Sequence, residues 1–264
     1  MAQPEIIYLA VVPPKTLEED VLRRAASLVV KDVSDMRLLL VGKIPRIIAK
    51  YQASGPAEAI ARGLKDAGLL AFVCRDSELR NRPESFMAHS AAPEGGRVVF
   101  RDRPGREARI TADEAFLIIR GRLQSVSRKE ITTKKRKLNI AATVLTGGLP
   151  VMRRTTQTSL QESFQSDEFV RIFDRKTSDP RVEMFRDHID YAFLGPALTA
   201  STPANFEILV AKLREWFPRA IYDERPTRSI QTDIPTADPA EAVNIGCRLI
   251  YFGYLAGERQ KGER

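Results

Sequence analysis

The densest cluster of side chains that could do chemistry is basic and lies between Arg120 and Lys137. The sequence there, RGRLQSVSRKEITTKKRK, holds eight Lys or Arg and one acid, a local charge of +7. The whole chain carries +8, which leaves about +1 for all other residues. Clustered cations neutralise phosphates by releasing counterions. The candidate partner- or phosphate-binding side chains are Arg120, Arg122, Arg128, Lys129, Lys134, Lys135, Arg136, Lys137 and, in a second small cluster, Arg153 and Arg154.

Two observations limit this interpretation of the basic stretch. It contains no aromatic residue on which a nucleic-acid base could stack. It also matches no nucleic-acid-binding module. We therefore favour a protein partner for this surface and keep RNA, DNA or an anionic surface as alternatives. A solvated loop without a partner is the simplest interpretation.

The other candidate chemistry is weaker. In Asp187-His188-Ile189-Asp190, carboxylates beside an imidazole could serve acid–base catalysis. In a strand, however, His188 and Asp190 would share one face and Asp187 the other, which favours a hydrogen bond at a strand edge. Gly147-Gly148 is not followed by the G-K-[ST] of a phosphate loop, so a plain turn is expected. We assign no catalytic residue and no cofactor.

Cysteine and histidine usage gives no metal site. The two cysteines, Cys74 and Cys247, lie far apart within apolar patterns, which predicts free buried thiols. With only His89 and His188 in addition, no metal-ligand spacing is present.

Length and composition indicate a globular protein of two domains. The chain has 264 residues, of which 43% are hydrophobic and 29% charged. The first residues have no basic leader, and their apolar run ends at Pro13-Pro14. No window is long and apolar enough for a membrane span. We expect a soluble, cytoplasmic protein.

Residues 1–76 predict a small α/β domain in the order β-α-α-β-α-β. Thr16-Leu-Glu-Glu19 has the pattern of a capping box at a helix start. The clearest helix begins at Ser54-Gly-Pro56 and ends at Gly68. The expected strands are 5–12, 46–52 and 69–74, and the expected helices are 16–29, 33–41 and 54–67.

This segment resembles the C-terminal domain of the bacterial ribosomal stalk protein. The matching pieces are Val21-Leu22-Arg23, Val33-Ser-Asp-Met-Arg-Leu-Leu-Leu40, Pro56-Ala-Glu-Ala-Ile60 and Leu64-Lys-Asp-Ala-Gly68. They cover little more than a quarter of the chain and are mostly core positions, so the resemblance implies a shared fold. That family engages translation GTPases through helix lysines and a glycine turn. This chain has Leu28-Val-Val-Lys31 at the turn and an inserted Pro45.

The rest of the chain predicts a mostly antiparallel β domain with C-terminal helices. We interpret 77–96 as a linker and 97–222 as the β domain, with a basic, partly mobile insertion at about 127–167. Within it, 155–167 is polar. Strands followed by the helix that opens at Thr202-Pro203 loosely resemble a pleckstrin-homology-like barrel.

The last part, 223–264, predicts a connection, a helix and a solvated tail. Asp238-Pro-Ala-Glu241 is a helix-start signal. Gly246 and Gly253 lie on one face of this helix and would permit close packing, for which we favour the main body over self-association.

The sequence as a whole favours a non-enzymatic binding or adaptor protein with the basic stretch as one contact surface. The first alternative is an RNA- or DNA-associated protein that uses the same stretch. The second is an enzyme acting on an anionic small molecule in a cleft between the domains, which would require convergent polar groups in a pocket.

Overall fold

The computed structural model describes residues 5–81, 85–138, 152–227, 234–236 and 238–262, and within these the side chains outside 124–165. Helices and strands are both present, which confirms the α+β class. The chain divides into two compact units, one formed by Met1–Leu123 with Asp167–Arg264 and the other by Gln124–Ser166. No helix in the described part of the chain is long and apolar enough to cross a membrane.

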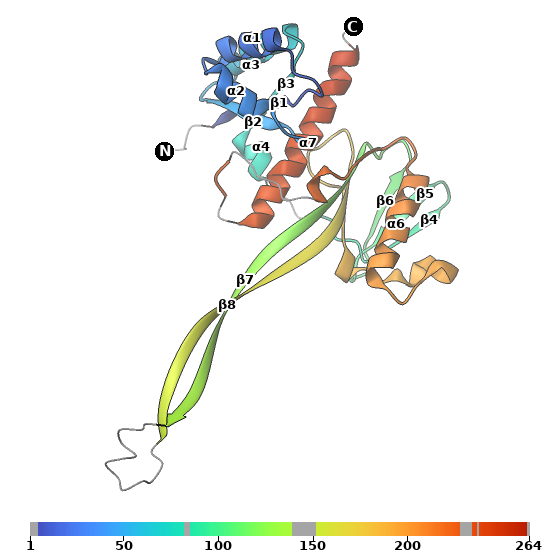
Figure 1. Cartoon of the computed structure of the whole chain (residues 1–264). Coiled ribbons are helices and arrows are strands. Elements are labelled where there is room, and N and C mark those ends of the chain that lie inside the picture. The colour runs from blue at the N-terminus through green and yellow to red at the C-terminus, as the bar shows by residue number, and fades with distance from the viewer. Residues whose placement is uncertain (1–4, 82–84, 139–151, 228–233, 237, 263–264) are drawn as a thin grey trace. The chain divides into compact units, whose positions relative to one another are not determined.

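The N-terminal part of the first unit is built on a three-stranded antiparallel sheet in the order β2-β1-β3 (Figure 1). The predicted order β-α-α-β-α-β is confirmed. The elements are β1 (Ile7–Val12), α1 (Glu19–Val29), α2 (Val33–Leu40), β2 (Arg46–Tyr51), α3 (Ser54–Asp66) and β3 (Leu70–Arg75). Because β1 is apolar along its whole length, it takes the central position, where both of its faces are covered.

The sheet has a separate core on each face, since successive strand residues point to opposite sides. On one face, helices α1–α3 pack over Leu9 and Val11. On the other face, Tyr8 and Ala10 pack against the C-terminal helix α7 (Pro239–Gly262). The first and last parts of the chain therefore form one three-layer arrangement (Figure 1).

Gly253 permits this close approach of α7 to the sheet. A Cβ at this position would lie 3.1 Å from side-chain atoms of both Val12 and Pro45. This confirms that the glycine serves packing against the main body.

The two predicted helix starts have different outcomes. At α7, the Asp238 carboxylate accepts a hydrogen bond from the Ala240 amide at 2.9 Å, as a capping residue should. The capping box predicted at Thr16 is wrong, because α1 begins only at Glu19 and has no side-chain cap. The Glu19 carboxylate instead forms ion pairs with Arg23 and with Arg37 of α2.

The turn after α1 is made by Val30. Val30 has φ 56° and ψ 54°, the left-handed conformation that β-branched residues rarely adopt. Its side chain is 90% exposed. The two amides after α1 still bond back to carbonyls of the helix, so the geometry of a glycine-type cap is formed without glycine.

The described residues between Ser90 and Asp223 supply two further sheets and the helix α6. A three-stranded sheet has the order β4-β5-β6, and a four-stranded sheet has the order β10-β7-β8-β9, in which β10 is parallel to β7. The helix predicted at Thr202-Pro203 is confirmed as α6 (Thr202–Trp216). The strands are β4 (Ser90–Glu94), β5 (Arg97–Arg101), β6 (Glu107–Thr111), β7 (Leu117–Leu138), β8 (Met152–Phe173), β9 (Val182–Phe185) and β10 (Ile221–Asp223).

The segment 77–96 was predicted as a linker, and this is wrong for its secondary structure. It contains most of helix α4 (Asp76–Arg80) and the whole of β4. Proline and glycine suggested an irregular chain, but β4 is an edge strand, where a proline can be accommodated. Pro93 lies opposite Val98 in the regular pairing of β4 with β5.

The basic stretch and the polar segment 155–167 were expected as loop, and this is wrong for their secondary structure, whereas their mobility stays a prediction. Both lie in long strands, β7 and β8, which are neighbours in the four-stranded sheet. Local composition suggested an irregular chain, but backbone pairing between two strands places few demands on side-chain hydropathy. The pleckstrin-homology-like arrangement and the domain boundaries stay predictions.

Candidate functional site

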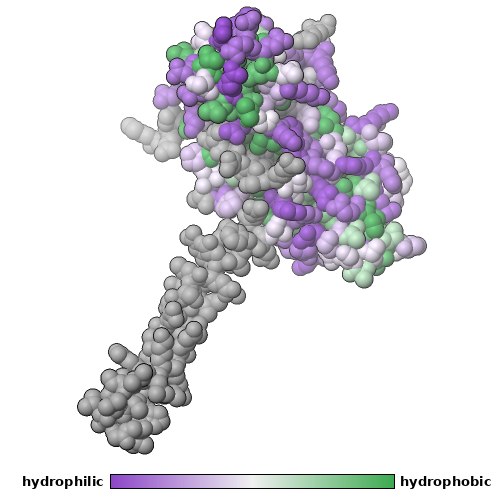
Figure 2. All heavy atoms as spheres, viewed as in Figure 1, coloured by the Kyte–Doolittle hydropathy of each residue, from purple (hydrophilic) through white to green (hydrophobic). Residues whose placement is uncertain are grey.

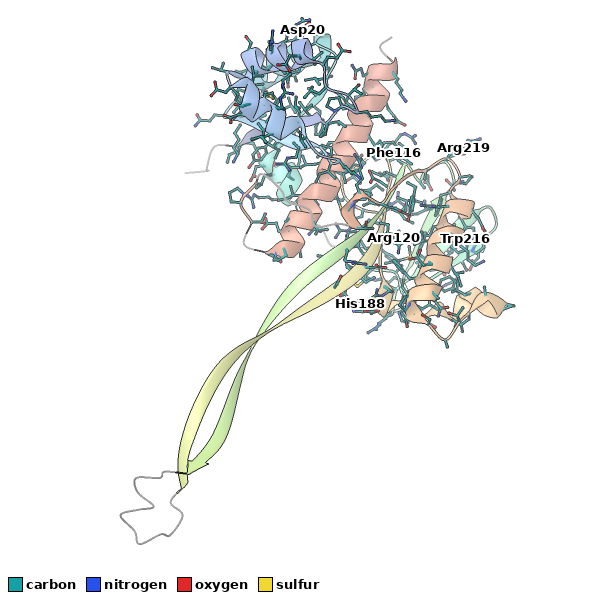
Figure 3. All side chains as sticks on the ribbon, viewed as in Figure 1. Asp20, Phe116, Arg120, His188, Trp216 and Arg219 are labelled. Atoms are coloured by element: carbon teal, nitrogen blue, oxygen red, sulfur yellow. The ribbon has the colours of Figure 1, made fainter. Side chains whose placement is uncertain are left out.

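Of the ten basic candidates, only Arg120 and Arg122 have described side chains. The others are Arg128, Lys129, Lys134, Lys135, Arg136, Lys137, Arg153 and Arg154, and their side chains lie outside the described residues. Both described arginines belong to β7, and Arg120 is labelled beside α6 in Figure 3.

Arg120 and Arg122 are paired with carboxylates. Arg120 donates two hydrogen bonds to Glu207 of α6, one of them at 2.9 Å, and a third to Glu168 of β8 at 3.3 Å. Arg122 donates to the other oxygen of Glu168 at 2.6 Å. The Arg120 guanidinium also lies 5.5 Å from the centroid of the Phe206 ring. These two cations thus join β7 to β8 and α6.

Gly121 explains why both arginines meet Glu168. Residues 120 and 122 share one face of the strand, and Gly121 faces the other side. There, a Cβ on Gly121 would lie 2.3 Å from the ring of Phe169, so only glycine leaves room for this ring. Glu168 and Phe169, as neighbours on β8, point to opposite faces in the same way.

The Glu168 carboxyl is held in its charged form by this arrangement. Burial raises its pKa, but hydrogen bonds from Arg122 and Arg120 outweigh the burial and hold the pKa below its ordinary value. Arg120 and Glu168 side chains are each 13% exposed. A phosphate could therefore reach the Arg120 guanidinium only by displacing Glu168 or Glu207, whereas the Arg122 side chain is 44% exposed and makes a single ion pair among the described residues, with Glu168.

The strand predicted around His188 is wrong, because His188 ends a short 3₁₀ helix. The predicted hydrogen bond at a strand edge is therefore wrong as well, and the His188 carbonyl instead bonds to the His89 ring. Arg186–His188 is a turn of 3₁₀-helix, and a second one spans Tyr191–Ala197. The nearby carboxylates are occupied: Asp187 pairs with Arg186 at 3.0 Å, and Asp190 accepts a bond from the Ala192 amide. Both carboxylates are therefore engaged by Arg186 or by a backbone amide.

The two histidines of the chain nevertheless line one pocket of about 290 Å³. His89 Nδ1 lies 2.5 Å from the carbonyl oxygen of His188, the residue labelled in Figure 3. Since a carbonyl only accepts, Nδ1 carries the proton. The described residues that line the pocket include no Ser, Thr or Cys. The contact joins the segment before β4 to the 3₁₀ helix at Arg186–His188, and the described lining of the pocket offers no nucleophile of these types.

A larger groove of about 510 Å³ lies beside β3, between α3 and α7. No pattern in the sequence predicted this groove. Its lining residues come from three elements and are Glu58, Ala61, Arg62, Lys65, Ala71, Phe72, Val73, Phe252, Leu255, Ala256 and Arg259. Figure 2 shows the mixture of hydrophilic and hydrophobic surface on one face of this part of the molecule.

The backbone of β3 offers unpaired hydrogen-bonding groups along this groove. β3 is an edge strand, and the Asp76 amide bonds to the Ile6 carbonyl at 2.8 Å. In an antiparallel pair the groups facing the neighbour alternate, so Phe72 and Cys74 also face β1. The N–H and C=O groups of Ala71 and Val73 consequently point away from the sheet.

The two edges of this sheet differ. The pairing of β1 with β2 is interrupted between Leu9 and Ala10, so Ile48 is an extra residue of β2. The pairing of β1 with β3 is regular from Ile7 to Val12. Bulges are among the features by which proteins block edge strands. The β2 edge has this protection and the β3 edge does not.

The groove carries an excess of positive charge. Arg62 and Lys65 of α3 and Arg259 of α7 line it together with one acid, Glu58. No ion pair joins these three cations to a carboxylate in the part of the chain that the structure describes. A helical spacing of three residues relates Arg62 to Lys65 in sequence, but Arg259 joins them only through folding.

The remaining chemistry of the described residues is limited. The free buried cysteines are confirmed. Burial raises the pKa of both thiols well above its ordinary value, with smaller contributions of either sign from neighbouring charges. Neither thiol is therefore an activated nucleophile. No group of three or more His, Cys, Asp or Glu that could hold a metal occurs among the described residues.

Comparison with known proteins gives no match: no family model, curated protein or solved structure is similar to this chain. The resemblances to the stalk protein and to pleckstrin-homology-like domains therefore stay predictions, and the function must be argued from the site.

Proposed function

We propose that this protein is a binding or adaptor module, and that its β3 edge binds an extended acidic segment of a partner protein as a fourth strand. The observation that carries the proposal is the regular, unbulged β3 edge beside a groove between two helices. Strand addition of this kind takes its affinity from main-chain hydrogen bonds and its specificity from side-chain contacts.

The groove supplies what strand addition needs. Val73, which is partly exposed, offers one donor and one acceptor on the outer side of β3, and the buried Ala71 lines the groove beside it. Helices α3 and α7 lie on the two sides of the strand, so side chains of an added strand would contact one helix or the other. The apolar part of this contact surface comes from Phe252, Leu255 and Ala256.

Charge favours an acidic segment. Three cations and one acid line the groove, and the cations have no internal partner among the described carboxylates. A segment with acidic side chains would pair with them, whereas a basic segment would be repelled. Because these charges are exposed, the attraction should weaken with salt.

Nucleic-acid binding through the basic stretch stays an alternative prediction. Two of its ten candidate residues, Arg120 and Arg122, are neutralised by Glu168 and Glu207. A phosphate surface would consequently depend on the other eight.

Titration of the intact protein with a labelled Val-Glu-Val-Glu-Val-Glu-Val peptide tests the proposal. We expect it to bind more tightly than Val-Lys-Val-Lys-Val-Lys-Val. Hydrogen exchange supplies the structural readout: the Val73 amide should become protected on binding, whereas the Phe72 and Cys74 amides are protected throughout.

Variants separate the edge from the surface charge. Val73→Pro removes a donor that faces the groove and keeps the bonds to β1, so it should weaken binding about tenfold, the size of one lost hydrogen bond. Arg62→Glu with Lys65→Glu should weaken it by a similar factor, and Arg24→Glu with Lys31→Glu, at exposed positions in and after α1, is the control matched in charge. Equal affinity for the two peptides, or unchanged binding by Val73→Pro, would contradict the proposal.

A further inference from the structure

A small polar pocket of about 170 Å³ lies where β8, β9 and α7 meet. Its lining includes Arg171 of β8, Glu183 of β9, and Asn244, Cys247 and Arg248 of α7. Ser178, in the turn between β8 and β9, completes one side. None of these residues belongs to the basic stretch or to the groove beside β3.

The two guanidinium groups in this pocket are almost completely buried. Arg171 and Arg248 are each 5% exposed. A buried cation is strongly destabilising unless it is paired and hydrogen-bonded. Arg171 Nε lies 3.2 Å from a carboxylate oxygen of Glu183, and Arg171 donates to the Asn244 amide oxygen at 2.6 Å. Arg248 donates to Asp179 at 2.7 Å and to the Leu79 carbonyl at 3.0 Å.

These partners do not use all the N–H donors of the two guanidinium groups. A guanidinium has five N–H groups. The Nε atoms of both Arg171 and Arg248 are buried and make no hydrogen bond with the described residues. The contact of Arg171 Nε with Glu183 is close enough for an ion pair but does not have hydrogen-bond geometry. A buried donor without an acceptor costs free energy, which a bound acceptor would recover.

The unpaired donors of the two arginines favour an oxyanion as that acceptor. Two cations and one carboxylate, Glu183, line the pocket, and a second carboxylate, Asp179, pairs with Arg248 from outside the lining. Cys247 adds no negative charge, because burial raises the pKa of its thiol above the ordinary value. Asn244 and Ser178 supply neutral polar groups that can bond to oxygen atoms.

We propose that this pocket binds a small phosphoryl oxyanion between Arg171 and Arg248. Guanidinium groups match the oxygen geometry of phosphate, and burial strengthens the interaction relative to an exposed site. The pocket volume suits inorganic phosphate or the phosphate group of a small monoester. The bound ion joins α7 to β8 and thereby stabilises the packing of the C-terminal helix.

Calorimetric titration of the intact protein with inorganic phosphate, at constant ionic strength and with chloride as the reference anion, tests this site. We expect one phosphate per chain and a rise in the unfolding temperature that saturates with phosphate. Glycerol phosphate in a parallel titration distinguishes the two sources of the group: tighter binding than phosphate identifies a monoester, and weaker binding identifies the free ion.

Two variants locate the binding. Ser178→Leu fills the pocket without removing an ion pair and should abolish phosphate binding, with Ser27→Leu on the exposed face of α1 as its matched control. Arg248→Lys keeps the charge but loses the planar donor set, so it should weaken binding at least tenfold. Absence of phosphate binding by the folded wild-type protein, or undiminished binding by Ser178→Leu, would overturn the proposal. Neither outcome bears on the β3 groove, which is tested with peptides.

Discussion

Two pairs of arginines in this protein differ in whether their sequence position reveals that they lie close together. Arg120 and Arg122 open the most basic stretch of the chain, and each is paired with carboxylates of Glu168 or Glu207. Arg171 and Arg248 stand apart in the sequence, yet both are buried at one pocket, where each pairs with one carboxylate, Glu183 or Asp179. All three of Arg120, Arg171 and Arg248 keep a buried Nε without a hydrogen bond to the described residues, but only Arg171 and Arg248 line a common pocket. Local density of basic residues therefore does not show which cations converge on a pocket.

The largest expected effect is the loss of stability caused by Arg171→Ala. Arg171→Ala removes a cation that is buried beside Glu183 and leaves that carboxylate uncompensated. We expect the free energy of unfolding to fall by about 3–5 kcal/mol, the usual cost of breaking a buried pair. Urea denaturation measures it.

Arg175→Ala is the matched control for Arg171→Ala. Arg175 pairs with Glu258 at 3.0 Å, and both side chains are about half exposed. Its loss should cost no more than about 1 kcal/mol. Equal losses of unfolding free energy in the two variants would show that burial does not determine how much each arginine contributes to stability.

An intermediate effect is expected within the basic stretch itself. Arg120→Ala loses bonds to two carboxylates and a contact with the Phe206 ring, so we expect a cost of about 1–3 kcal/mol. Arg122→Ala, at a side chain that is 44% exposed, should cost about 1 kcal/mol or less. Urea denaturation of both variants in parallel measures the two costs. A larger loss of stability in Arg122→Ala than in Arg120→Ala would contradict this prediction.

The smallest effect concerns acid pH. The pKa of Glu168 is lower in the folded protein than its ordinary value of about 4.3, so its pairing stabilises the fold at higher pH. This contribution is lost as pH falls through the folded-state value. Stability measured from pH 6 to pH 3 should therefore fall less steeply in Glu168→Gln than in the wild-type protein. The same slope in both proteins would exclude Glu168 as a contributor.

Much of the N-terminal architecture could be predicted from local patterns. The apolar spacing from Ala57 to Leu64 and the stop at Gly68 define α3, because a helix buries one face whatever its surroundings. The same reasoning predicts α6 and the helix start at Asp238. It fails at Thr16, where the Glu19 carboxylate pairs with arginines, and at His188, where a 3₁₀ turn replaces a strand.

The candidate sites could not be predicted in this way. The β3 groove combines Arg62 and Lys65 with Arg259, and the phosphate pocket combines Arg171 with Arg248. Each set lies on elements that are distant in sequence, and no spacing rule relates them. The signal that could have indicated the pocket is an arginine within the otherwise apolar pattern of each element, at Arg171 and at Arg248.

The sequence by itself determined where helices and strands form in the first 76 residues, that the two cysteines are buried, and that α7 has a glycine for close packing. These properties depend on the periodicity of apolar residues and on single side chains. Only the tertiary structure decided which arginines are neutralised, which edge of the sheet is open and which polar groups converge on a pocket. Those properties depend on distances between residues far apart in the chain, which are set by how α6 and α7 pack against strands of different sheets.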